Sequence, residues 1–177
     1  QAIFSITGNA ALLKKTYVPK YEFTVAKVTS SLVNLIFSLG AMIIVFLICK
    51  VKFSVYFLWI PVVLIEIYIF CLGLGMFLAQ AAVFFRDVQY IYGVLTTVWM
   101  YLTPIFYPLS ALPDNVQMLI KTFNPMYFYI EQFRHVVLNG AMPDVQLILS
   151  GCVISAFMLL IGTWTFSRTQ DKFILYI

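Results

Sequence analysis

The chain has 177 residues, of which 63% are apolar, 18% aromatic and only 10% charged. A soluble domain carries about 45–50% apolar and about 25% charged residues, so this composition cannot cover a globule of the same length with polar side chains. It excludes an ordinary soluble enzyme, a disordered chain and a disulfide-rich secreted module, and it predicts a polytopic membrane protein. We attribute the net charge of +4 to Lys and Arg at the ends of membrane spans rather than to nucleic-acid binding.

The N-terminal segment, residues 1–8, precedes the first long apolar stretch. The chain begins with Gln1, and its start shows no basic segment followed by a cleavage site. We interpret residues 1–8 as the tail of an earlier span that leaves the membrane toward the cytoplasm. The sequence is therefore expected to be an N-terminally truncated copy of a longer protein.

Four stretches are long and apolar enough to be membrane-spanning helices. These spans are predicted at about 28–49, 57–84, 90–109 and 146–167. Each would reach at least about 30 Å, which is the thickness of the hydrocarbon core. Helices are expected because lipid offers no partner to backbone N–H and C=O groups, and because the alternating pattern of a β-barrel strand is missing. The predicted fold is an all-α polytopic membrane helix bundle.

The basic residues predict which side of the membrane each connection occupies, because cytoplasmic connections carry the excess of Lys and Arg. Four crossings place both ends of the chain on one side. Seven basic residues lie on that side and four on the other, so both termini are expected in the cytoplasm. The seven are Lys14, Lys15, Lys20, Lys27, Arg86, Arg168 and Lys172, and the four are Lys50, Lys52, Lys121 and Arg134.

Between the third and fourth spans, two short amphipathic helices are predicted at about 113–124 and 126–139. Apolar residues recur at helical spacing in each, an Asn-Pro pair separates them, and Asn139-Gly140 is the expected end of the second. Each would be roughly 15–21 Å long, which is too short to cross the bilayer. The pattern favours a re-entrant hairpin that enters from the outer face, and a hairpin lying on the surface is the alternative.

The sequence carries no recognisable catalytic motif. It has no phosphate-binding loop, dinucleotide fingerprint or nucleophile elbow, and its single histidine, His135, excludes an HExxH zinc site. Glu131 lies one helical turn before His135, and we interpret the two as a surface pair rather than a catalytic dyad. No catalytic or metal-binding residue is therefore predicted. Cys49, Cys71 and Cys152 are expected to be buried small hydrophobes, because they lie in apolar runs without a CxxC spacing.

An ordered set of motifs resembles a known family. The set comprises NAALLKKTYVPK at 9–20, LGLGMFLA at 72–79, VFFRDV at 83–88, TPIFYPLS at 103–110 and EQFRHVVL at 131–138. In this order, and over essentially the whole chain, the motifs resemble the membrane permease of bacterial ABC-2 type exporters of cell-surface polysaccharide, namely O-antigen, teichoic-acid and capsule exporters. Family members usually have six spans after an interfacial helix, so the resemblance also implies a truncated N-terminus here.

The resemblance implies a transport subunit that moves lipid-linked polysaccharide from the cytoplasmic to the outer side of the bacterial inner membrane. It implies a homodimer of permeases above two cytoplasmic ABC ATPase subunits, which would bind the ATP and Mg, so this chain is expected to hold no cofactor. An ABC-2 permease for drugs or small lipids is the alternative within transport. A membrane-embedded lipid-sugar transferase is a further alternative, and it would need paired acids or an acidic metal-binding loop that we do not see.

By the same resemblance, the connector at 9–23 is a coupling helix that enters a cleft of the ATPase. Its residues suit an amphipathic helix with an apolar face and a basic face, and Pro19 would end it. A basic interfacial helix on anionic lipid is the alternative. The residues assigned to ATPase coupling are Leu12, Leu13, Lys14, Lys15, Tyr17 and Lys20.

The short helix pair corresponds in the family to helices that close the outer mouth of the channel. Aromatic faces suit the apolar C–H faces of sugar rings, so the tyrosines near this mouth are assigned to a polymer path, with an interfacial aromatic belt as the alternative. The Arg-Asp pair at 86–87 is either an interfacial anchor or a cytoplasmic gate that contacts a lipid diphosphate. The residues assigned to the polymer path or gate are Arg86, Asp87, Tyr101, Phe106, Tyr107, Tyr127, Tyr129, Glu131 and Arg134.

Glu66 is the single charge within the second span. An ionised carboxylate at the centre of a membrane helix costs at least about 2.5–3.5 kcal/mol on insertion scales, so this side chain should face protein or water, or be protonated. Tyr68 and Asn34 are its expected partners. A structural contact is favoured over a proton relay, because no second buried acid accompanies it. Small residues are expected to allow close helix packing: Gly73, Gly75, Gly151 and Ser155.

Overall fold

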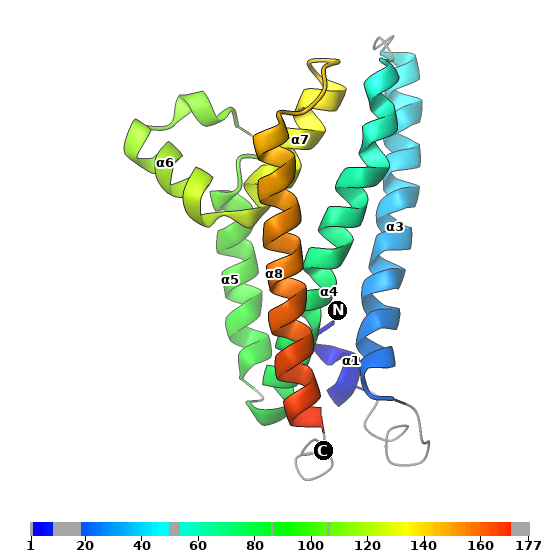
Figure 1. Cartoon of the computed structure of the whole chain (residues 1–177), viewed down its shortest axis with the longest axis vertical. Coiled ribbons are helices and arrows are strands. Elements are labelled where there is room, and N and C mark those ends of the chain that lie inside the picture. Colours follow the sequence, from blue (N-terminus) through cyan, green and yellow to red (C-terminus); the bar gives the residue numbers. More distant parts are fainter. Residues whose placement is uncertain (1, 9–18, 50–53, 86, 106, 171–177) are drawn as a thin grey trace. The chain divides into compact units, whose positions relative to one another are not determined.

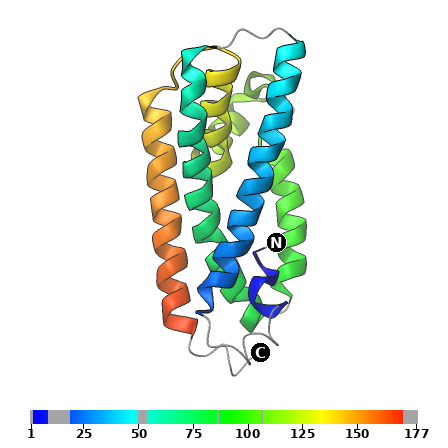
Figure 2. The same cartoon turned by 90° about the vertical axis from the view of Figure 1, so that its right-hand side faces the viewer.

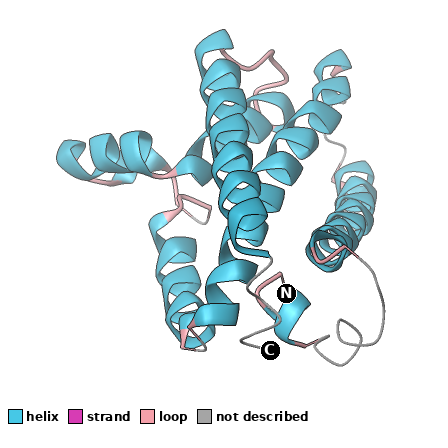
Figure 3. Ribbon diagram, turned by 60° about the horizontal axis from the view of Figure 1, so that its bottom comes forward, coloured by secondary structure: helices cyan, strands magenta, loops and turns pink. Residues whose placement is uncertain are grey.

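The computed structural model describes residues 2–8, 19–49, 54–85, 87–105 and 107–170. Within these ranges the chain forms helices and short connections, and it forms no strand (Figure 3). The predicted all-α fold class is therefore confirmed. The elements are α1 (Phe4–Thr7), α3 (Tyr21–Ile48), η1 (Val55–Trp59), α4 (Ile60–Phe84), α5 (Val88–Leu102), η2 (Leu109–Ala111), α6 (Asp114–Phe123), α7 (Pro125–Val137) and α8 (Val145–Thr169).

Three long helical segments in the described part of the chain are apolar enough to cross a membrane. They are Tyr21–Ile48, Val55–Phe84 and Val145–Thr169, with 28, 30 and 25 residues. At 1.5 Å per residue, these segments measure about 38–45 Å, which exceeds the hydrocarbon core of about 30 Å. They coincide with the first, second and fourth predicted spans, so the chain is a membrane protein.

The third predicted span, 90–109, does not form one continuous helix. Helix α5 has 15 residues and ends at Leu102, so it is about 22 Å long. Pro104 explains this end, because proline has no N–H to donate to the preceding turn and disfavours the helical conformation of the residue before it. The chain continues with an N–H of Ile105 bonded to the carbonyl of Thr103 at 2.7 Å.

The chain divides into two compact units. Unit 1 comprises Gln1–Lys52, Tyr68–Gln89 and Ala156–Ile177, and unit 2 comprises Phe53–Ile67 and Tyr90–Ser155. Helices α4 and α8 each contribute one part to either unit.

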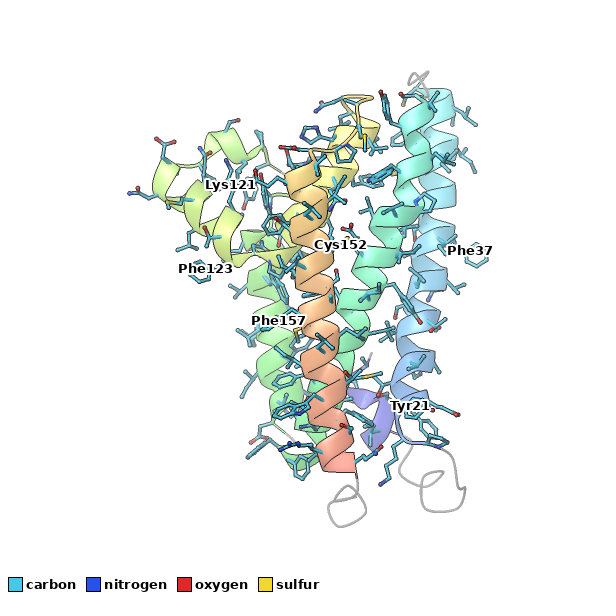
Figure 4. The ribbon with its side chains drawn as sticks, in the orientation of Figure 1. Tyr21, Phe37, Lys121, Phe123, Cys152 and Phe157 are labelled. Atoms are coloured by element: carbon cyan, nitrogen blue, oxygen red, sulfur yellow. The ribbon has the colours of Figure 1, made fainter. Side chains whose placement is uncertain are left out.

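Unit 1 has an apolar core near the start of α3. The short helix α1 lies beside this start (Figures 1 and 2), where the Ser5 and Thr24 hydroxyls are 2.9 Å apart and buried. Farther along, most side chains of α3 are exposed, and Phe37 projects outward from the helix (Figure 4). Exposed apolar side chains suit a helix in lipid. The buried core residues are Ile6, Met76, Ala79, Val83 and Phe166, with Val25 and Phe84 packed against them.

Glycines allow α4 and α8 to touch within unit 1. A Cβ on Gly73 would lie 2.3 Å from the carbonyl oxygen of Met158, and a Cβ on Gly162 would lie 2.1 Å from the carbonyl oxygen of Gly73. Neither position has room for a side chain. This agrees with the expectation that Gly73 allows close helix packing, and it adds Gly162, which the sequence analysis did not single out.

The expectation that the three cysteines are buried is wrong. All three thiols are free; Cys49 and Cys152 are exposed and Cys71 is partly buried. An apolar run does not imply burial when the helix lies in lipid, because the membrane itself accepts apolar side chains.

Candidate functional site

The candidate site is the α6–α7 pair together with the end of α5, all within unit 2. Helices α6 and α7 have 10 and 13 residues and lie where the two short helices are predicted. They are about 15 and 20 Å long, too short to span the bilayer. Gly140 has φ +59°, and the N–H of Ala141 bonds to the carbonyl of His135 at 3.2 Å. Helix α7 ends at Val137, two residues before the predicted Asn139-Gly140. Re-entry into the membrane stays a prediction.

Asn124 fixes the junction between α6 and α7 to the end of α5. Its Oδ1 accepts hydrogen bonds from the Trp99 indole N–H at 2.8 Å and from the N–H of Met126 at 3.1 Å. Its Nδ2 donates to the Thr103 hydroxyl at 2.9 Å. An Asn before a helix that starts with proline is a recognisable cap. The hydrogen bonds to Trp99 and Thr103 join residues that are separated by 25 and 21 positions in the chain. No local pattern in the sequence predicts them.

Arg134 connects α7 to the chain that follows α5. Its Nη2 donates to the carbonyls of Pro104 and Ile105. These carbonyls follow the last turn of α5, where the helical hydrogen-bond pattern is broken. On the same helix, Glu131 lies 3.9 Å from Arg134 and 3.9 Å from His135. The predicted pair of Glu131 and Arg134 is therefore formed, and Arg134 has a second role that the sequence analysis missed.

The tyrosines assigned to the polymer path differ in exposure. Tyr101 is 66% exposed, whereas Tyr127 is 8% and Tyr129 is 1% exposed. The Tyr107 hydroxyl donates to the carbonyl of Tyr101 at 2.9 Å. In this conformation Tyr127 and Tyr129 offer almost no ring surface to a passing molecule, so their assignment stays a prediction. Phe106 lies outside the described residues.

The environment of Tyr127 raises the pKa of its hydroxyl. Burial raises the pKa of the phenol, the Glu131 carboxylate raises it further, and Arg134 lowers it. The ring meets that of Phe128 edge to face, with centroids 5.6 Å apart, an arrangement that aromatic pairs prefer. Tyr127 is thus a packed aromatic residue with a neutral polar group in this structure.

An apolar groove of about 310 Å³ lies between α5 and α6. Trp99 and Leu102 line it from α5, and Ile120 and Phe123 line it from α6. Asn124 is at its edge, where its amide is occupied by the hydrogen bonds described above. The groove was not predicted, because it depends on how two helices meet.

A buried polar cluster joins α4, α7 and α8 in unit 2. Glu66, Tyr129, Gln132 and Ser155 are each 3% exposed or less. Gln132 Nε2 donates to Glu66 Oε2 at 2.9 Å, and the Cys152 thiol donates to Glu66 Oε1 at 3.2 Å. The Ser155 hydroxyl donates to the carbonyl of Glu66 at 2.9 Å. The Tyr129 hydroxyl lies 2.7 Å from that of Ser155.

Gly151 makes this cluster possible. A Cβ there would lie 2.5 Å from Glu66 Oε2, 2.8 Å from Gln132 Nε2 and 3.3 Å from the Tyr129 ring. Any larger residue would push the carboxylate and the amide away from α8. The prediction that Gly151 and Ser155 allow close packing is therefore confirmed, and their neighbour is the polar cluster rather than another apolar helix face.

The expected partners of Glu66 are wrong. Its carboxylate is bonded to Gln132 and Cys152, whereas the Tyr68 hydroxyl lies 2.9 Å from the hydroxyl of Thr29. Asn34 is exposed on α3. Residues 66 and 68 differ by about 200° around a helix, so they face different neighbours. The prediction of a structural contact without a second buried acid agrees with this geometry.

Most of the predicted coupling segment lies outside the described residues. This applies to Leu12, Leu13, Lys14, Lys15 and Tyr17, and also to Arg86 of the predicted cytoplasmic gate. Lys20 is described at the start of α3, where its Nζ donates to the carbonyl of Gln170. Asp87 is exposed. The coupling and cytoplasmic gate assignments stay predictions.

Comparison with known proteins gives one family and a consistent set of relatives. Residues 3–138 match the family described as ABC-2 type transporter. The chain is 26% identical over 96% of its length to the O-antigen export system permease protein RfbA of Myxococcus xanthus. It is 25% identical over 97% of its length to a protein of the same name from Klebsiella pneumoniae. The chain covers 65% and 66% of these two relatives, so it spans just under two thirds of their length.

Proposed function

Because the chain belongs to the ABC-2 type transporter family, we propose that it is the membrane-spanning subunit of an ATP-driven exporter of lipid-linked cell-surface polysaccharide. It would move the polymer from the cytoplasmic to the outer side of the bacterial inner membrane. The observation that carries this proposal is the similarity over 96–97% of the chain to proteins named O-antigen export permeases.

The helix directions in unit 1 support four crossings. Val83 near the end of α4, Phe166 near the end of α8 and Val25 near the start of α3 lie in one apolar core. Helices α4 and α8 therefore run in the same direction. If both cross the membrane, the chain between them must cross it once in the opposite direction. Helix α5 is the longest helix described within 85–144. We assign the return to α5 and the residues that follow it, which places both ends of the chain on one side of the membrane. The excess of basic residues favours the cytoplasm as that side.

The energy would come from separate subunits. The printed sequence contains no phosphate-binding loop, so ATP and Mg would bind to two cytoplasmic ABC ATPase subunits beneath a dimer of permeases. The segment at 9–23 would enter a cleft in each ATPase. In a helical conformation, its lysines and leucines would provide a basic and an apolar face.

The α6–α7 pair would close the outer mouth of the channel. Asn124 and Arg134 attach the pair to the end of α5 through side-chain hydrogen bonds, so a tilt of α5 would move the pair with it. Aromatic rings at this mouth would contact the apolar faces of sugars weakly at many places, which allows a polymer to be held and still slide.

The proposal is tested by complementation. The full-length gene is expressed with its neighbouring ATPase in a strain that lacks its own O-antigen permease, and surface polysaccharide is measured with antibody. We expect surface polysaccharide only when the ATPase is intact, and none when its phosphate-loop lysine is replaced. Polymer that stays in the cytoplasm while drugs leave the cell would contradict the polysaccharide assignment.

A further inference from the structure

Helix α7 is held in unit 2 partly through polar side chains. Its five buried residues include Tyr127, Tyr129 and Gln132, which carry hydroxyl or amide groups. Gln132 Nε2 donates to Glu66 Oε2 on α4 at 2.9 Å and to the carbonyl of Leu147 on α8 at 3.2 Å. One amide therefore contacts both neighbouring helices. The position of α7 depends on hydrogen bonds that a small displacement would break, because such bonds weaken steeply with distance and angle.

Both ends of α7 are places where the chain changes direction. The helix begins at Pro125, directly after the extended Asn124. It ends before Gly140, whose φ of +59° is strained for other residues. The Ser54 hydroxyl bonds to the carbonyl of Gly140 at 3.2 Å. A rigid helix of 13 residues between two such joints can turn as one piece.

The polar cluster contains a buried oxygen without a hydrogen bond when α7 is docked against α4 and α8. Within the described part of the chain, Gln132 Oε1 is buried and has no hydrogen-bond partner. The described ion pairs all involve Glu131, so the Glu66 carboxylate has a neutral amide and a thiol as donors and no described cation beside it. An unpaired buried oxygen reduces the stability of the docked arrangement. Such an arrangement can be released at small cost.

We infer that Glu66 and Gln132 form a latch that holds α7 in the closed position, and that breaking their hydrogen bond is a step in opening the outer mouth. This inference rests on the proposed function, because it treats α7 as part of the outer gate. Glu66 and Gln132 are positioning residues in this step. Release of the latch would uncover Tyr127 and Tyr129, which are buried while α7 is docked.

The latch is tested with the full-length permease in liposomes loaded with carboxyfluorescein, without ATPase or ATP. Glu66→Met and Gln132→Met each remove one partner and leave the other unpaired. We expect each to raise dye release about tenfold, the change that about 1.4 kcal/mol produces in an equilibrium. Gln146→Met is the matched control, because Gln146 is exposed in the first turn of α8. It should release dye at the wild-type rate.

The double variant separates a latch from two independent structural roles. If the two side chains act as one contact, Glu66→Met combined with Gln132→Met should release dye no faster than the faster single variant. If Glu66→Met does not accumulate in the membrane, Gln132→Met and Tyr129→Phe are used in its place. Each of them removes a hydrogen bond from the same cluster.

Dye release at the level of Gln146→Met in every accumulated cluster variant would overturn the latch. This outcome is distinguishable from failure of the proposed function, because dye release needs neither ATPase nor polysaccharide. A wild-type protein that exports no polysaccharide in the complementation assay would reject the proposed function, whatever the dye assay shows.

Discussion

The contact between Gly73 and Gly162 gives a quantitative prediction for Gly162→Ala. The added Cβ would lie 2.1 Å from the carbonyl oxygen and 2.8 Å from the Cα of Gly73. Non-bonded heavy atoms need about 3.5 Å, so α4 and α8 must separate by about 1 Å or more. All the opposing atoms are backbone atoms, which no side-chain rotation can move. Overpacking of this kind costs typically 1–3 kcal/mol and we expect the upper half of that range, about 2–3 kcal/mol.

Helix propensity opposes part of this cost, because alanine is favoured over glycine by about 1 kcal/mol. The expected net loss is therefore about 1–2 kcal/mol, which corresponds to a fall in Tm of roughly 2–8 °C for a chain of this size. The assay is thermal unfolding of the purified protein in detergent. Gly93→Ala is the matched control, because nothing lies within 4 Å of a Cβ at Gly93. Equal melting temperatures for Gly162→Ala and Gly93→Ala would show that α4 and α8 do not clash at this contact.

Two further predictions concern the attachment of α6–α7 to α5. Asn124→Leu leaves the Trp99 indole and the N–H of Met126 without their acceptor, so it should destabilise the pair by about 1–3 kcal/mol. Limited proteolysis should then cut within 113–140 faster than in wild type. An unchanged cleavage rate would contradict this role of Asn124. Arg134→Met removes the donor to the carbonyls of Pro104 and Ile105. Proteolytic cleavage within 103–110 should become faster while Tm changes little. Cleavage at the wild-type rate would show that Arg134 does not hold this segment.

Helices with a clear pattern could be predicted from the sequence, and the contacts between them could not. The two short helices were expected because their apolar spacing, the proline at 125 and Gly140 are local signals. The third span was expected to be helical up to residue 109, because its apolar composition shows no end, whereas Pro104 ends helix α5 at Leu102.

The partners of Glu66 illustrate what a single sequence does not contain. Tyr68 was proposed because it is nearby in the chain, yet the partner is Gln132, 66 residues away. Nothing about Gln132 distinguishes it from a surface residue until α7 is placed against α4. The burial of Tyr129 could not be predicted for the same reason. The sequence shows an aromatic residue but not which side of α7 packs against other helices.

The outer-gate assignment is tested by determining the side of the membrane on which α6–α7 lies. Serine replaces Cys49, Cys71 and Cys152, and single cysteines are placed at Lys121 on α6 and at Asp87 after α4, both of which are exposed. Right-side-out membranes are then treated with an impermeant maleimide. We expect Lys121→Cys to react from outside, whereas Asp87→Cys should react only after permeabilisation. A cysteine at 121 that reacts only after permeabilisation would contradict an outer gate.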